Sequence, residues 1–186
     1  MAVLKVKYDT KPSYEQRTGM KKYHKKYHDD SSLEDVISYV LAPEKTPNRF
    51  IGWYSVNPNQ AALEMKMLAY AYGKDYGIRL RHFVISFSSR EVKRFHPYVY
   101  ETLYKIGGFA ANYYRGEYQI IFAVHEKPEN PHIHFVMNTV NYVTGEKYRG
   151  DIGDYHRFQA YLGKFLMEQY GLELMPVKDH YDIENG

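Results

Sequence analysis

EYQIIFAVH (117–125) and HIHFVMNTVNY (132–142) are two apolar segments that lie close together in the chain. Both contain β-branched and aromatic residues at the density that is typical of strands. The six residues between them, EKPENP (126–131), are polar, contain two prolines and are short enough to close a hairpin. The sequence therefore predicts that the two segments pair as antiparallel neighbours in a β-sheet.

Three histidines belong to this predicted hairpin. Side chains at positions i and i+2 of a strand point to the same face, so His132 and His134 should project side by side while Ile133 points into the core. His125 ends the first strand, and the hairpin would bring it close to the pair. Three neutral imidazoles from paired strands suit a divalent metal with positions left open for substrate. A His-x-His pair alone would fit a solvated surface equally well; the third histidine favours a metal site.

Length and composition limit the class of protein. A chain of 186 residues is long enough for one domain with a full hydrophobic core. Cysteine is absent, which excludes disulfides and thiolate metal sites. No apolar stretch approaches the ~20 residues of a membrane span, and the N-terminus lacks the apolar region of a signal peptide. We therefore expect a soluble cytoplasmic protein.

A basic and aromatic repeat stands near the N-terminus. The net charge of +3 is too small to indicate a nucleic-acid ligand by itself. However, Lys-Lys-Tyr-His occurs twice in succession over residues 21–28. Lysines neutralise phosphates and tyrosine rings stack on unpaired bases, so the repeat suits single-stranded DNA, although a solvated basic linker fits equally well. The candidate DNA contacts in it are Lys21, Lys22, Tyr23, Lys25, Lys26 and Tyr27.

Periodicity and turn signals predict an α+β fold. The expected architecture is a sandwich with a mostly antiparallel central sheet, helices packed on one face, and the histidines on the opposite, less covered face. Residues 1–178 would form one catalytic domain, and residues 179–186 a polar tail that begins a further region. The expected elements are a strand over 2–8, a loop or short helix over 9–30, a helix from Ser31 or Ser32 to before Pro43, a strand over 50–56, a helix from Asn57-Pro58 to near Gly77, a strand over 80–87, a helix over 97–114, the two hairpin strands, and a helix capped by Asp154 that ends at Gly171.

Chemistry at such a metal site requires a second group. An open metal could support hydrolysis by activated water or displacement at phosphorus. No His-Glu-x-x-His helix is present, so a metal-dependent hydrolase of small molecules has no visible base. Phosphoryl transfer through a covalent intermediate needs a hydroxyl nucleophile, and the ordinary pKa of a tyrosine, near 10, means that such a group needs help at neutral pH. Tyr39 is the candidate, since it lies near the end of an amphipathic helix and only partly joins its apolar stripe; packing against the sheet is its alternative role.

The segments SYVLAPEKT (38–46) and H-x6-HIHFVMNTVNY-x-TG-x-K (125–147) together resemble the relaxase, or mobilisation nuclease, family. The similarity is greatest to the P-type relaxases of plasmids and integrative conjugative elements of Gram-positive bacteria, which are HUH endonucleases. It extends from about Leu33 to Lys147. The tyrosine precedes the histidines, whereas rolling-circle replication initiators and HUH transposases, the nearest alternatives, usually have the opposite order.

The resemblance implies an enzyme that nicks one DNA strand at an origin of transfer. By this comparison Tyr39 attacks the scissile phosphate, forms a 5′-phosphotyrosyl bond, releases a 3′-hydroxyl, and the strand is later rejoined. His125, His132 and His134 would hold Mn²⁺ or Mg²⁺ against the phosphate. The implied partners are single-stranded origin DNA, relaxosome accessory proteins and a type IV secretion coupling protein. A non-catalytic single-strand binder is the alternative from another class.

The sequence departs from many relatives at two positions. Lys127 stands where many carry an acidic residue, and Asn130 stands where many carry an additional histidine. Glu126 or Glu129 could supply the missing carboxylate, and Asn138 shares the strand face of the histidines and could orient a ligand by a hydrogen bond. Lys45, within the tyrosine segment, is a further candidate DNA contact.

Overall fold

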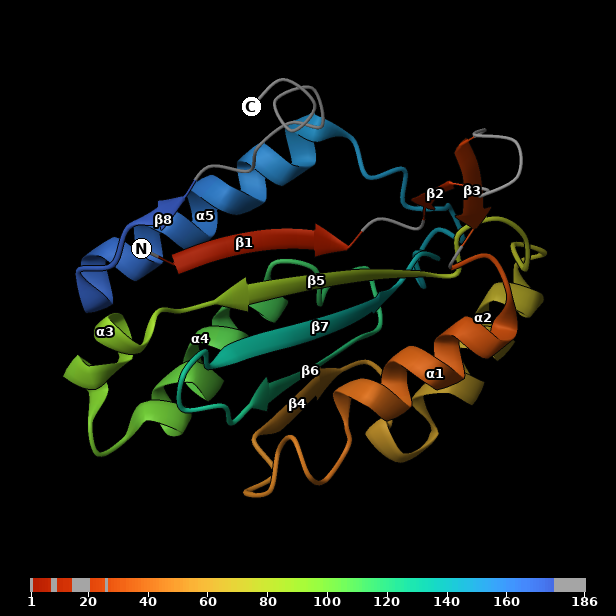
Figure 1. Cartoon of the computed structure of the whole chain (residues 1–186). Coiled ribbons are helices and arrows are strands. Elements are labelled where there is room, and N and C mark those ends of the chain that lie inside the picture. The colour runs from red at the N-terminus through yellow and green to blue at the C-terminus, as the bar shows by residue number, and fades with distance from the viewer. Residues whose placement is uncertain (1, 8–9, 15–20, 26, 176–186) are drawn as a thin grey trace.

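A computed structural model describes residues 2–7, 10–14, 21–25 and 27–175. It has an α+β fold, as predicted, built on a six-stranded sheet with the order β4-β6-β7-β5-β1-β8 (Figure 1). None of the helices in these residues is long and apolar enough to cross a membrane. The sheet strands are β1 (Ala2–Lys7), β4 (Ile51–Tyr54), β5 (Leu80–Ser86), β6 (Ile120–His125), β7 (His132–Asn138) and β8 (Leu174–Met175). The helices are α1 (Asp30–Val40), α2 (Ala61–Ala71), α3 (Ser89–Val92), α4 (Val99–Asn112) and α5 (Ile152–Tyr170), with short 3₁₀ turns η1 (Pro58–Gln60) and η2 (Lys93–Phe95).

The predicted hairpin forms the middle of the sheet. Strands β6 and β7 pair antiparallel, with His125 directly opposite His132. Every residue of both strands is buried. The other neighbours also pair antiparallel, except that β8 lies parallel to β1. This register places all three histidines at one end of the hairpin, next to its loop.

Helices cover both faces of the sheet, which corrects the expectation that they pack on one face only. The larger core lies between one face and helices α4 and α5, around Phe122 and Phe135. A second core on the other face joins the apolar side chains of α1 and α2 to Ile121, Ala123 and Val136. Figure 1 shows α1 and α4 on opposite sides of the sheet. Because Ile121, Ala123 and Val136 make part of the second face apolar, that face needs a covering layer too.

Capping explains where the helices begin. Asp29 caps α1 by accepting a hydrogen bond from the backbone N–H of Ser32, so the cap is Asp29 and not Ser31 or Ser32. Asp151 caps α5, three residues before the predicted Asp154. In both helices the capping aspartate lies three residues before the backbone N–H that it accepts from, which is the N–H of Ser32 in α1 and of Asp154 in α5. Asn57 caps η1 and Gly171 ends α5, as the sequence predicts.

Residues 10–14 and 21–25 form a pair of strands, whereas the sequence predicts a loop or short helix over 9–30. Strands β2 (Thr10–Tyr14) and β3 (Lys21–Lys25) form a separate two-stranded antiparallel sheet. Their alternation is weak in the sequence, since both strands are polar. The shorter elements α3 and β8 were also not predicted. The tail, 179–186, lies outside the described residues.

Gly107 lets α4 approach the sheet closely. A Cβ atom at this position would lie 2.6 Å from two ring atoms of the buried Phe122, whereas one at Gly108 would meet nothing nearer than 3.9 Å. We therefore expect Gly107→Ala to destabilise the protein by ~1–3 kcal/mol through overpacking. Gly108→Ala should stabilise it by up to ~1 kcal/mol through helix propensity. Urea unfolding of both variants measures the change in the free energy of unfolding. Equal changes would show that the Phe122 ring moves aside at little energetic cost.

Candidate active site and metal centre

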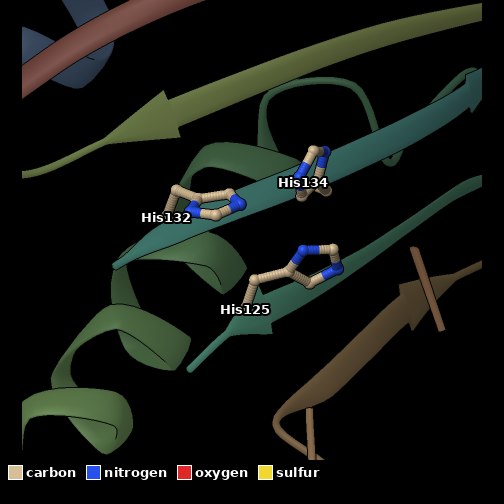
Figure 2. Close-up of side chains that lie close together, drawn as sticks. All are labelled: His125, His132 and His134. Atoms are coloured by element: carbon tan, nitrogen blue, oxygen red, sulfur yellow. The ribbon is translucent and has the colours of Figure 1, made fainter. Parts of the chain in front are cut away.

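His125, His132 and His134 converge on one point from adjacent strands. One ring nitrogen from each lies within 4.8 Å of those of the other two. The ring centroids are 4.3 Å apart for His125 and His134 and 4.8 Å apart for His132 and His134. Figure 2 shows the three rings turned toward one another above strands β6 and β7. All three side chains are buried, so the predicted cluster of histidines is present.

Backbone carbonyls orient two of these rings. Nε2 of His125 lies 3.0 Å from the carbonyl oxygen of Val40, and Nδ1 of His132 lies 2.7 Å from that of Asn130. A carbonyl only accepts hydrogen bonds, so these two nitrogens carry the protons. The opposite nitrogens, Nδ1 of His125 and Nε2 of His132, then have lone pairs for a metal. Nδ1 of His125 is buried without a hydrogen-bond partner among the described residues, which an ion would satisfy.

Burial keeps His125 neutral. It lowers the pKa of this imidazole to about 4. The hydrogen bond to Val40 partly opposes this shift, and the positive charges of Lys45, Lys127 and a protonated His132 add to it. At neutral pH the imidazole is therefore uncharged, with a proton on Nε2 and a lone pair on Nδ1 that can bind a metal. Three neutral imidazoles fit a divalent transition ion well.

Tyr39 lies directly against this cluster. Its ring centroid is 5.5 Å from that of His125 and 5.4 Å from that of His134. The residue nevertheless remains 45% exposed, so it is not enclosed in the core. Nζ of Lys45 lies 3.4 Å from the ring centroid of Tyr39, as a cation–π contact. A partly exposed phenol, a cation and a buried cluster of potential metal ligands thus lie together, an arrangement that suits displacement at a phosphodiester.

The family comparison agrees with this geometry. The sequence model of the relaxase family, described as "Relaxase: MobA/VirD2-like, nuclease domain", matches residues 39–172. The chain belongs to this family. No curated protein and no solved structure gave a match. The matched region begins at Tyr39 and includes the three histidines, and it assigns the chain to the DNA-nicking nucleases rather than to small-molecule hydrolases or passive DNA binders.

A fourth histidine, to which the sequence analysis assigns no role, is hydrogen-bonded to the cluster. Nε2 of His82, on β5, lies 2.8 Å from Nδ1 of His134. Nδ1 of His82 in turn lies 3.4 Å from the hydroxyl of Tyr27. If His134 held a metal through Nε2, its Nδ1 would carry the proton and His82 would accept that hydrogen bond. Residues 82–84 lie within the stretch that resembles relaxases, but the sequence does not reveal that β5 lies beside β7 and so gives His82 no role.

His82 is therefore expected to orient His134. Replacing His82 with leucine should weaken Mn²⁺ binding ~10–100-fold, the usual effect of losing the partner of a ligating imidazole. The His82→Gln variant keeps an acceptor oxygen on a side chain of similar length and should recover part of that affinity. Isothermal titration calorimetry measures both. Equal affinities for the leucine and glutamine variants would mean that His82 contributes only packing.

Two of the three predicted orienting residues bond to other groups, and the third is exposed. Glu126 accepts hydrogen bonds from the backbone N–H and the side-chain amide of Asn48, so it fixes the loop between α1 and β4. Glu129 is exposed in the β6–β7 loop. The side-chain amide of Asn138 donates to the carbonyl of Met65 and to Gln119, and it thereby ties α2 to the sheet. Asn138 does share the face of the histidines, but at the far end of β7.

The candidate DNA contacts of the basic repeat are separated. Lys21, Lys22, Tyr23 and Lys25 lie on strand β3, and Lys26 lies outside the described residues. Tyr27 is only 2% exposed and packs in the core with α1 and α2, which corrects the expectation that its ring stacks on DNA. Lys45 is the candidate that lies at the active site.

Proposed function

We propose that this relaxase domain nicks one DNA strand at an origin of transfer by transesterification on Tyr39, and later rejoins the strand. The main support is the position of Tyr39, which packs against two of the three clustered histidines while the residue stays 45% exposed. The order of tyrosine before histidines also favours this reaction over replication initiation or transposition.

The proposed step conserves phosphodiester energy. The Tyr39 oxygen forms a bond to phosphorus as the bond from phosphorus to the 3′-oxygen breaks. The phenol loses its proton and the departing 3′-oxygen gains one, so the products are a 5′-phosphotyrosyl bond and a free 3′-hydroxyl. Rejoining is the reverse reaction, in which a 3′-hydroxyl attacks the phosphotyrosine. The exposure of Tyr39 leaves it accessible to a DNA strand.

Each neighbouring side chain has a role in this scheme. His125, His132 and His134 would hold a divalent ion, and His82 and the carbonyls of Val40 and Asn130 keep those rings oriented. When bound, the ion supplies positive charge to the non-bridging phosphate oxygens. Lys45 adds a second positive charge beside the nucleophile. Imidazole ligands hold Mn²⁺ more tightly than Mg²⁺, and we propose one of these two ions as the cofactor.

The wider setting is part of the same proposal. We propose a conjugative plasmid or integrative element as the source of the origin DNA, with relaxosome accessory proteins and a type IV coupling protein as partners, in the cytoplasm where that DNA resides. Residues 1–178 would act as one catalytic domain, since strands near both ends of the described chain, β1 and β8, pair in one sheet. Lys21, Lys22, Tyr23, Lys25 and Lys26 would contact DNA beyond the nick.

A covalent adduct is the test. The protein is incubated with Mn²⁺ and single-stranded oligonucleotides that cover candidate origins, then digested and analysed by mass spectrometry. The expected product is a peptide that contains Tyr39 with a nucleotide attached through phosphate. A free 5′-phosphate without any protein adduct would indicate hydrolysis by water and would contradict the proposed mechanism.

A further inference from the structure

Trp53 occupies an unusual place for a large aromatic side chain. It is the only tryptophan of the chain, and it is 49% exposed on the edge strand β4. It lies opposite Ile121 in the β4–β6 register, and Ile121 belongs to the core on the α1 face. Directly opposite residues of paired strands point to the same face. The indole therefore lies on the face of the sheet that also carries the histidines and Tyr39.

A hollow of about 480 Å³ adjoins this indole. Its walls come from the segment after the nucleophile, from β4 and from the turn before α2; the residues are Leu41, Pro43, Thr46, Pro47, Arg49, Ile51, Trp53, Pro58 and Asn59. The volume lies within the range of small-ligand sites, ~300–1,000 Å³, and leaves room for one nucleotide. Four of its residues are apolar rings or prolines that suit the flat face of a base.

Charge and chain continuity connect this hollow to the active site. Arg49 lines it, and no carboxylate is among the described residues of its wall. A second large hollow, near the start of α5, differs in this respect because Glu117, Asp151 and Asp154 line it. The segment from Leu41 to Arg49 contains Lys45, whose ammonium group lies on the ring of Tyr39. A strand that passes the nucleophile would meet positive charge first at Lys45 and then at Arg49.

We infer that this hollow is a base pocket for a nucleotide next to the scissile phosphate, with Trp53 as the stacking platform and Arg49 as the phosphate contact. The inference rests on the proposed nicking of single-stranded DNA and adds where a base is held during that reaction. Stacking on an exposed indole is open to an unpaired base and closed to a paired one. The pocket therefore selects single-stranded over duplex DNA at this point of the strand.

The single tryptophan makes a direct test feasible. Indole emission of the full chain, excited where tyrosine does not absorb, reports on Trp53 alone. The probes are an oligothymidylate of about 12 nucleotides and an abasic strand of equal length and charge, in buffer with chelator so that no cleavage occurs. We expect oligothymidylate to quench the emission and the abasic strand to leave it unchanged. Equal quenching by both strands would overturn the inference, since it would show a backbone effect.

The affinities of Trp53 variants for the two strands measure how much stacking contributes to binding. Trp53→Ala should weaken binding of oligothymidylate roughly tenfold or more, while its affinity for the abasic strand matches that of the unmodified protein. Trp53→Phe should retain part of the difference in affinity between oligothymidylate and the abasic strand. This variant keeps an aromatic ring at the position and so also controls for misfolding. Tyr70→Ala is the matched control, because Tyr70 is 76% exposed but does not line the hollow. Unchanged affinity of Trp53→Ala for oligothymidylate would overturn the inference.

Three other outcomes are distinguishable. If emission changes with protein concentration without DNA and light scattering detects a dimer, the β4 edge pairs with a second copy and the inference is wrong. If Tyr39 forms its adduct but quenching does not depend on bases, the nicking proposal stands and the base pocket alone fails. If base-dependent quenching occurs without any adduct, the pocket stands and the nicking proposal fails.

Discussion

Tyr39→Phe is expected to abolish the covalent protein–DNA adduct while leaving DNA binding intact. The substitution removes one hydroxyl oxygen and keeps the ring that packs against His125 and His134. Without that oxygen no phosphotyrosyl bond can form, so nicking should fall by at least ~10³-fold, as for other enzymes that lose their nucleophile. Denaturing electrophoresis of a labelled oligonucleotide measures the adduct, and fluorescence anisotropy measures binding.

A matched control separates chemistry from general damage. Tyr98 is an exposed tyrosine outside the histidine cluster, so Tyr98→Phe should nick at the rate of the unmodified protein. A Tyr39→Phe variant that still forms the adduct would show that another of the 21 tyrosines is the nucleophile. Peptide mapping of the adduct would then identify it. Loss of both binding and nicking would instead indicate that Tyr39 holds α1 in place.

His132→Gln is expected to remove most of the metal affinity. The imidazole contributes a ring nitrogen to the cluster, whereas the flexible amide of glutamine is a poorer ligand for a transition ion. The loss in Mn²⁺ affinity should exceed the ~10–100-fold that we expect for the orienting residue His82. Calorimetric titration of the metal-free protein measures the two variants on one scale, and adduct formation should fall in the same order.

The control for this experiment is a histidine that lies outside the cluster. His156 is exposed on α5, so His156→Gln should bind Mn²⁺ as the unmodified protein does. Single-stranded binding in chelator should be the same for all of these variants, because it does not need the ion. An unchanged Mn²⁺ affinity in His132→Gln would show that the three histidines do not form the metal site.

The cluster of three histidines could be predicted from the sequence because two local rules locate it. Alternation along a strand places His132 and His134 on one face, and a short hairpin returns His125 to their side. Both rules depend only on residues that are close in the chain, and the β6–β7 register confirms them. The α+β class and most helix and strand positions followed from the same kind of local periodicity.

The residues that contact the three histidines could not be predicted from the sequence. His82 comes from β5, 52 residues before His134, and only the strand order places β5 beside β7. Glu126 was expected near the metal because it follows His125, yet it bonds to Asn48 in another loop. Tyr27 belongs to a basic repeat but is buried under α1 and α2. Sequence proximity does not specify these contacts, since each depends on how distant segments pack.

The sequence by itself determined the chemistry that this chain can carry: a tyrosine, three imidazoles in hairpin spacing, and the motifs of a relaxase. Those features follow from covalent order and from the two-residue period of a strand. Only the tertiary structure decided how they combine. It covers both faces of the sheet with helices, sets Tyr39 against the histidines, joins His82 to His134 and exposes Trp53 at the sheet edge, because these relations arise when apolar surfaces that are far apart in the chain are buried together.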